Sequence, residues 1–475
     1  MARADGPGAR RGADGDAPAG PGPRAGLALV LLGSAALRVA LVLRGGQYYW
    51  PDEDRYRISQ QLFSALRAGE WSSAALGLSQ SPDHLGFKLL GLLPAALEQA
   101  LGSDPRIPAL FFGASSVLAL WLAWRIALAA GAGGREALLA ALLLALSSSF
   151  LYYSRHLLPY DAGMALGLLA LWAALGRPSG LRCALCGLAA AAAFLTYNGY
   201  WTLAGLALLV RALEPWEGPA ELARRAGAAA LGATLPVLAL AAAAAGGDLI
   251  GAFQRFSGTI HQGEFDEGWS LPFAYLWHAE GALLAILGAG VVGALWPQRG
   301  VPLARRARLW LLAAAGIYAA LAFTSVVLER FVVYGRLARQ IVPFLCLLAA
   351  HGLERLRRSG RIGSRLAQLA CALAIAAAAM NFRQPLAQEF PRDFAREARR
   401  VGAAEGGPWA LLYAEHLYPE ARAALLPPHE VVLRAPHPLQ YLPYQYEGYT
   451  PAQRESLREV DISMRLVRRL DAAGQ

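Results

Sequence analysis

The first polar loop of the chain begins with Tyr48-Tyr49-Trp50-Pro51-Asp52-Glu53-Asp54-Arg55-Tyr56, soon after the apolar run Ala25–Leu43. That run is long enough to cross a membrane. The three consecutive carboxylates cannot lie inside a bilayer without a large free-energy penalty, so they mark a water-facing surface at the membrane boundary. Pro51 followed by carboxylates is also an ordinary helix start. The loop alone therefore leaves two interpretations open, an acidic functional site and a helix start.

The composition identifies a membrane protein. Of the 475 residues, 56% are hydrophobic, and apolar runs of about 17 to 22 residues recur, as expected for several membrane spans. The formal net charge is +10, but the arginines gather in short loops between these runs, which indicates membrane topology and not nucleic-acid binding. Cys183-x-x-Cys186 has no nearby His or Cys partner, so we interpret it as helix wall and not as a metal site.

The apolar runs predict about eleven transmembrane helices. Residues 1–24 carry four arginines and are expected to form a disordered cytoplasmic tail. If the short run Leu85–Leu101 crossed the membrane, the later arginine-rich loops would lie outside, so the positive-inside rule favours an interfacial position for it. The transmembrane domain is then residues 25–381, with 44–106 as its first outer loop. The predicted spans are residues 25–43, 107–128, 136–153, 160–176, 182–197, 199–213, 226–245, 279–296, 309–328, 332–353 and 365–381.

The segment 382–475 is polar and is predicted to lie outside the cytoplasm. It contains strand candidates at Trp409–Tyr413 and Val431–Leu433 and a helical stretch at Phe394–Val401, which fits a small α/β domain. The predicted fold class is therefore an all-α polytopic membrane protein with a small C-terminal α/β extracytoplasmic domain.

Polar side chains recur where the predicted helices reach the outer face. Arg155 and Asp161 bracket one tight turn, Tyr197 and Asn198 follow another helix, and His261 lies in a long outer loop. These residues share a face with the acidic loop. We expect them to contribute to one site.

Three further arginines lie on this outer face, where the positive-inside rule predicts a shortage of arginine: Arg330, Arg336 and Arg339. Guanidinium groups bind phosphate through two parallel hydrogen bonds, so their position suggests an anionic ligand. The alternative is that they extend to the phosphates of membrane lipids.

A carboxylate cluster that faces an arginine cluster fits the transfer of a sugar from a lipid phosphate. The leaving phosphate needs cations to offset its charge in the transition state. The acceptor hydroxyl needs a carboxylate to take its proton as it attacks the anomeric carbon. A helical bundle provides a hydrophobic groove for the lipid tail.

The segment Trp50–Tyr56 resembles the first outer loop of the GT-C glycosyltransferases, in the branch of the lipid A aminoarabinose transferases and protein O-mannosyltransferases. The resemblance continues at Asp104–Pro108, Tyr153–Asp161 and Tyr334–Leu353, and so covers most of residues 26–381. It implies that Asp52 is the catalytic carboxylate, with Glu53 beside it and Asp161 as the acid of the second outer loop.

The chain departs from these relatives at two phosphate-binding positions. They often have a lysine where this chain has Asn198-Gly199, and a His/Lys-Pro pair where it reads Pro82-Asp83-His84-Leu85-Gly86-Phe87-Lys88. We therefore expect the donor phosphate to contact some of Arg336, Arg330, Arg339, Lys88, His84 and Arg55. We expect the rest of the substrates to contact Tyr56, Arg155, Tyr197, Asn198 and His261. Asp52-x-Asp54 matches an Asp-x-Asp metal pattern, although lipid-phosphate donors do not require a metal.

The sequence thus predicts a membrane glycosyltransferase at the outer face of a bacterial cytoplasmic membrane. Its donor would be a polyprenyl-phosphate sugar, and its acceptor a hydroxyl or phosphate on a lipid, glycan or protein. The alternatives are a transporter or flippase for a lipid-linked sugar and a non-catalytic binder of one. Transporters tend to place polar groups at mid-membrane in broken helices with inverted repeats, and the sequence has no evident repeat of that kind.

Overall fold

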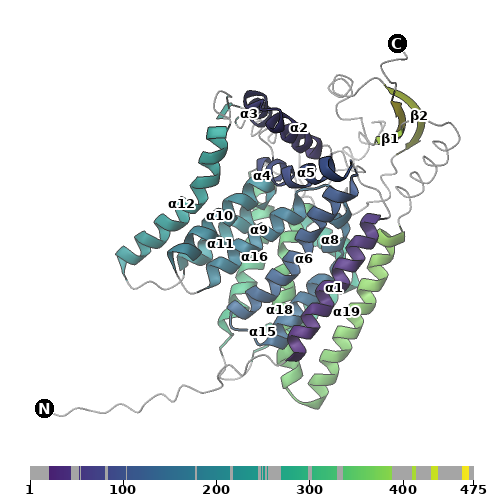
Figure 1. Ribbon diagram of the computed structural model, residues 1–475. Coiled ribbons are helices and arrows are strands. Elements are labelled where there is room, and N and C mark those ends of the chain that lie inside the picture. The colour runs from purple at the N-terminus through teal and green to yellow at the C-terminus, as the bar shows by residue number, and fades with distance from the viewer. Residues whose placement is uncertain are drawn as a thin grey trace.

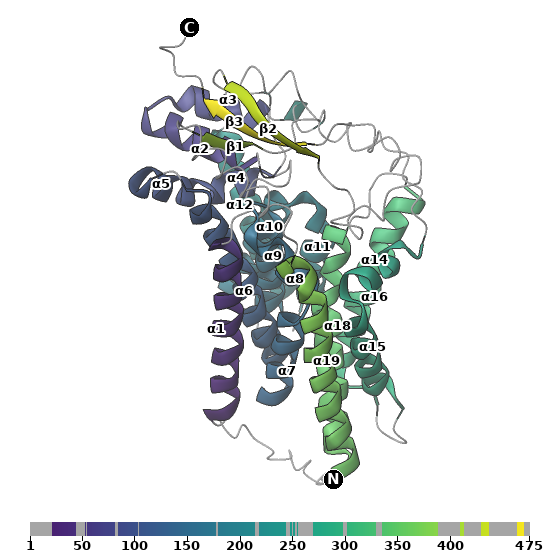
Figure 2. The same cartoon turned by 90° about the vertical axis from the view of Figure 1, so that its right-hand side faces the viewer.

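The computed structural model is predominantly a helical bundle (Figure 1). The structure describes residues 21–43, 53, 55–80, 84–102, 104–176, 179–213, 218–243, 248, 250–251, 254, 269–297, 302–328, 335–387, 409–412, 429–436 and 463–469. Within these ranges, α1 begins at one end of the bundle, and α2–α5 lie at the other end (Figure 2).

Four of the described helices are long and apolar enough to cross a membrane. They are α1 (Pro21–Leu43), α6 (Arg106–Ala129), α16 (Arg305–Val326) and α19 (Arg361–Ala387). A fifth span is obtained if α7 (Gly134–Ala145) is joined to Ser148–Arg155 across a bend of 64°. Three shorter apolar helices are α9 (Tyr160–Leu175), α10 (Gly180–Thr196) and α15 (Ala282–Leu295). The polytopic helical class is confirmed, and the number eleven stays a prediction.

The remaining helices of the bundle are α11 (Trp201–Leu213), α12 (Pro219–Ala243), α14 (Leu271–Glu280), α17 (Gly335–Ala338) and α18 (Val342–Arg358). Glycines allow close helix packing. A Cβ atom at Gly187 in α10 would lie 1.9 Å from the carbonyl oxygen of Ala229 in α12, and one at Gly352 in α18 would lie 1.9 Å from that of Gly290 in α15. The helix backbones therefore touch directly, as small residues permit in membrane bundles.

The first outer loop folds into four short helices. They are α2 (Arg55–Arg67), α3 (Trp71–Gln80), α4 (Leu85–Leu90) and α5 (Leu92–Leu101). The run Leu85–Leu101 is thus two helices, and even the longer one reaches only about 15 Å at 1.5 Å per residue, half the thickness of a bilayer core. The position of this run at the membrane surface stays a prediction.

Buried polar groups fix the bend between α7 and α8 (Ser148–Tyr152). The fully buried Glu280 accepts hydrogen bonds from the backbone N–H groups of Ser148 and Ser149, at 2.9 and 3.1 Å, and from the hydroxyl of Ser147 at 2.6 Å. It therefore satisfies donors that a helix start leaves open. Arg38 of α1 donates to the Phe150 carbonyl at 2.9 Å and so ties α8 to the first span.

Three strands are described in the C-terminal segment, β1 (Trp409–Leu412), β2 (His429–Pro436) and β3 (Ser463–Arg469). They form an antiparallel sheet in the order β1-β3-β2. Strands at both predicted positions are confirmed, whereas β3 was not predicted. The stretch Phe394–Val401 lies outside the described residues, so the α/β character of this domain stays a prediction.

Candidate functional site

Glu53 joins the first outer loop to the second. Its side chain is fully buried, and its Oε1 accepts the backbone N–H of Leu157 at 2.7 Å. The same oxygen lies 3.3 Å from Nδ1 of His156. The carboxylate of Glu53 therefore makes an internal hydrogen bond that holds this residue of the acidic loop against the turn before α9.

His156 connects this contact to Arg155. The Nε of Arg155 donates to Nε2 of His156 at 3.3 Å, which places the imidazole proton on Nδ1, facing Glu53. Burial lowers the pKa of His156 below its usual value, and the charge of Glu53 opposes that effect. The imidazole is therefore neutral at pH 7 and links the two charged side chains.

Asp161 and Arg339 form a buried ion pair between the start of α9 and the short 3-10 helix η5 (Arg339–Ile341). Nη2 of Arg339 donates to Oδ1 of Asp161 at 2.6 Å. The guanidinium also lies over the rings of Phe150 and Tyr153, with its Cζ at 4.7 and 5.1 Å from the ring centroids. Within the described part of the chain, Oδ2 of Asp161 and both Nε and Nη1 of Arg339 have no hydrogen-bond partner. The pair keeps unused hydrogen-bonding capacity in the interior.

Tyrosine rings line the space beside this ion pair. Tyr160 lies between Tyr153 and Tyr197, with ring centroids 5.0 and 4.8 Å apart, and Tyr197 packs on Tyr200 at 4.9 Å. The hydroxyl of the fully buried Tyr200 has no hydrogen-bond partner among the described residues. The predicted residue Tyr197 is thus part of a rigid aromatic group.

The start of α4 docks on the 3-10 helix η3 (Asn198–Tyr200). The backbone N–H of His84 reaches Oδ1 of Asn198 at 3.4 Å, and the imidazole packs on Tyr197 with ring centroids 5.1 Å apart. Gly86 permits this approach, because a Cβ atom there would lie 2.6 Å from the hydroxyl oxygen of Thr196. Lys88, one turn further on, is fully buried. The structure therefore brings together His84, Tyr197 and Asn198, which the sequence predicted separately.

Tyr56 has a structural contact. Its hydroxyl donates to Oε2 of Glu98 at 2.6 Å, and Gln60 donates to the same oxygen at 2.9 Å. Its ring packs edge-on against Phe112, and its side chain is fully buried. Tyr56 therefore links α2 to α5 and α6, and its contact with substrate stays a prediction.

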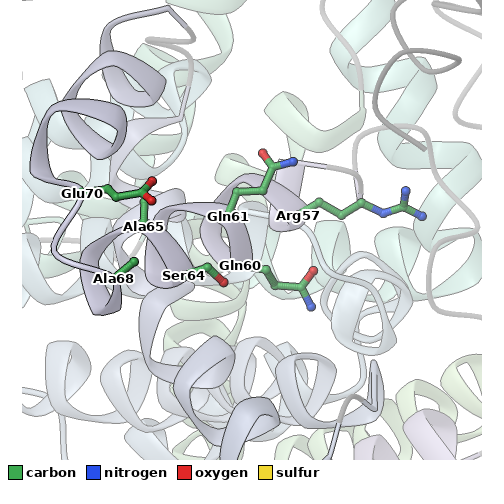
Figure 3. A pocket seen from close by; sticks show the side chains of 7 residues that line it. All are labelled: Arg57, Gln60, Gln61, Ser64, Ala65, Ala68 and Glu70. Atoms are coloured by element: carbon green, nitrogen blue, oxygen red, sulfur yellow. The ribbon is translucent and has the colours of Figure 1, made fainter. Parts of the chain in front are cut away.

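The polar face of α2 borders an open hollow of about 540 Å³ (Figure 3). It is lined by Arg57, Gln60, Gln61, Ser64, Ala65, Ala68 and Glu70. This lining contains none of the residues that we predicted to bind substrate. It shows instead the hydrophilic side of the amphipathic helix that follows the acidic loop.

Several predicted residues lie outside the described part of the chain: Asp52, Asp54, His261 and Arg330. Arg336 belongs to α17, but its side chain is not described. Arg55 begins α2, at the end of the bundle where α2–α5 lie. Among the residues that the structure describes, no three His, Cys, Asp or Glu side chains are grouped to hold a metal.

The structure adds Arg38 and Tyr160 to this region, and the sequence prediction missed both. Arg38 interrupts the first apolar run, and a charged residue inside a membrane span is a signal of function or of a buried partner. Tyr160 carried no such signal, because nothing in the sequence distinguishes it from the many other tyrosines.

The fold and the site define a polytopic helical membrane protein with a buried cluster of carboxylates, cations and tyrosines at the end where α2–α5 lie. No protein-family model matches the chain, and no curated protein is similar to it by sequence. The similarity to known proteins is found in solved structures.

ArnT from Cupriavidus metallidurans bound to undecaprenyl phosphate superposes with a TM-score of 0.51 at 15% identity, over 79% of this chain and 72% of that one. The apo state of ArnT gives 0.49 at 20% identity, over 80% and 69%. The archaeal oligosaccharyltransferase AglB from Archaeoglobus fulgidus, in complex with an inhibitory peptide and a dolichol-phosphate, gives 0.43 at 14%, over 75% and 55%. The first superposition shows that this chain shares the fold of ArnT, in agreement with the resemblance noted in the sequence.

Proposed function

We propose that this protein is a GT-C-type glycosyltransferase that moves a sugar from a polyprenyl-phosphate donor to an acceptor hydroxyl or phosphate. One observation carries the proposal. Glu53, in the acidic loop, is bound to the turn before α9 in a chain that shares the fold of ArnT. Since the ArnT structure holds undecaprenyl phosphate, a lipid-linked donor is the natural candidate for this chain.

We assign the general base to Asp52. It would take the proton from the acceptor hydroxyl as the acceptor oxygen attacks the anomeric carbon. The bond between that carbon and the phosphate oxygen breaks, and the lipid phosphate leaves with the electron pair. Glu53 would act as a positioning residue, because its buried carboxylate fixes the backbone next to Asp52.

We assign the binding of the leaving phosphate to the cations that the sequence predicts on this face. Arg336 is the first candidate, and Arg330 and Arg339 are the next. Arg339 has two N–H groups left beyond its bond to Asp161, and Lys88 and His84 approach from α4. In an alanine series, loss of the residue that contacts phosphate should weaken donor binding, since a charge-assisted hydrogen bond contributes roughly 1.5–3 kcal/mol. Unchanged donor affinity in Arg330→Ala, Arg336→Ala and Arg339→Ala would contradict this assignment.

We place the reaction at the outer face of a bacterial cytoplasmic membrane, with an extracytoplasmic C-terminal segment, from the arginine asymmetry of the loops. Mass spectrometry of envelope lipids and glycans from a deletion strain tests the function. Loss of one sugar modification, restored by the wild-type gene and not by the Asp52→Asn variant, is the expected result. Unmodified levels of every envelope glycan in the deletion strain would contradict a transferase.

A further inference from the structure

Three arginine side chains gather at the end of the bundle opposite the candidate site. Asp161 lies at the start of α9, and α9 ends at Leu175, so Gly176 lies at the far end. Arg125 near the end of α6, Arg182 at the start of α10 and Arg211 near the end of α11 meet there.

The ring of Trp172 lies close to two of these guanidinium groups. The Cζ of Arg125 lies 5.1 Å from the centroid of the Trp172 ring and 5.2 Å from that of Trp121. The Cζ of Arg182 lies 5.0 Å from the Trp172 ring. These distances are within the range of cation–π attraction, so the Trp172 ring interacts with both guanidinium groups.

Arg211 brings a third charge and has unused donors. Its Nη1 donates to the Gly176 carbonyl at 3.2 Å, while its Nε and Nη2 have no hydrogen-bond partner among the residues that the structure describes. The residue is only 5% exposed, so water does not readily reach these donors. A Cβ atom at Gly176 would lie 0.8 Å from Nη1 of Arg182. The guanidinium groups of Arg182 and Arg211 therefore flank the same glycine.

Among the residues that the structure describes, none of the three guanidinium groups hydrogen-bonds a carboxylate. Glu214 and Glu217, which follow Leu213 in the sequence, lie outside the described residues. By contrast, Arg306 is paired with Glu136 at 2.9 Å. A buried cation without a partner is costly, and bringing like charges together adds to the cost. An anion between the arginines would remove both penalties.

We propose that Arg125, Arg182 and Arg211 bind the phosphate of an anionic phospholipid headgroup from the leaflet at this end of the bundle. Arginine forks match the geometry of phosphate oxygens. Basic pockets between helices on the cytoplasmic side bind such headgroups, and this end is the one that the arginine-rich loops predict to be cytoplasmic. The side chains of Leu181 and Leu213, at 82% and 73% exposed, provide apolar contacts for acyl chains that a soluble anion would not use.

The test compares the full-length protein in phosphatidylglycerol and in phosphatidylcholine, with soluble glycerol phosphate as a third condition. Phosphatidylglycerol should raise the melting temperature above the value in phosphatidylcholine. Arg211→Gln should abolish that difference and weaken phosphatidylglycerol binding by about tenfold or more, since each lost charge-assisted hydrogen bond contributes roughly 1.5–3 kcal/mol and 1.4 kcal/mol is tenfold. In phosphatidylcholine the variant should be at least as stable as the wild type, because it removes an unpaired buried charge.

Arg361→Gln is the matched control, because Arg361 is an exposed arginine at the same end, at the start of α19. It should keep the full response to phosphatidylglycerol. The partly exposed Arg182 supplies a second variant, Arg182→Gln, if Arg211→Gln does not purify. Equal responses in wild type and the site variants would overturn the proposal. An equal shift from glycerol phosphate alone would overturn the assignment to a lipid.

Discussion

Replacing Arg339 by methionine tests whether the ion pair with Asp161 organises the interior of the site. The two side chains are 0% and 4% exposed, and their closest atoms are 2.6 Å apart. Removing one partner of a buried ion pair costs about 3–5 kcal/mol, because the other charge is left unpaired. With an unfolding entropy of about 2.1 cal/mol/K per residue, a chain of 475 residues loses roughly 1 °C for each kcal/mol. We therefore expect the melting temperature to fall by about 3–5 °C.

The informative variant is the double substitution Arg339→Met with Asp161→Asn. It removes both charges, so its melting temperature should lie closer to that of the wild type than the sum of the single losses predicts. Residues in direct contact usually show an interaction energy of about 0.5–3 kcal/mol in such a cycle. Thermal unfolding of the four purified proteins in one detergent, followed by tryptophan fluorescence, measures it. Arg361→Met controls for the loss of an exposed arginine.

Strict additivity would refute this reasoning. If the double variant loses as much as the two single variants together, the side chains do not stabilise each other. The hydrogen bond between them then does not describe the protein in solution.

Further predictions concern the loops and the topology. Glu53→Gln keeps an acceptor for the Leu157 N–H and Glu53→Ala does not, so the alanine variant should lose more stability than the glutamine variant, by roughly 0.5–1.5 kcal/mol for a neutral hydrogen bond. Equal losses would contradict the contact. Burial lowers the pKa of His156, so the unfolded chain binds the proton more readily. The free energy of unfolding should therefore fall as pH drops below about 6.5, by at most about 1.4 kcal/mol per pH unit. His156→Asn should remove this pH dependence of the free energy of unfolding. An unchanged pH profile in the variant would contradict the prediction. Topology reporters fused after residues 103 and 475 should give an extracytoplasmic signal, and a reporter fused after residue 180 should give a cytoplasmic signal. A cytoplasmic signal at 475 would refute the topology.

The sequence predicted which loops meet but not which side chains pair. Carboxylates and cations at the membrane boundary placed Glu53 and Asp161 at one end, and the structure has both there. The segment of His84 was also expected on that face, and it contacts Asn198. Burial and charge patterns are local properties of the chain, so a single sequence reveals them.

The partners could not be predicted, because they depend on packing between distant segments. Arg38 contacts Phe150, which is 112 positions away in the chain. Asp161 was predicted as an acid of the site and Arg339 as a phosphate ligand, and their hydrogen bond to each other spans 178 positions of the chain. The hydrogen bond from Tyr56 to Glu98 could not be predicted for the same reason, since no local pattern places α5 beside α2.

The measurement that most directly tests the proposed transferase is sugar transfer by purified Asp52→Asn beside donor binding by the same sample. The amide keeps the size of the carboxylate and removes its basicity. General-base help is commonly worth about 10² to 10⁴ in rate, so we expect transfer to fall by that order while donor affinity stays near the wild-type value. Asp54→Asn, two residues along, serves as the matched control and should have a milder effect. Near-normal transfer by Asp52→Asn would contradict the account and leave the acidic loop as an ordinary helix start.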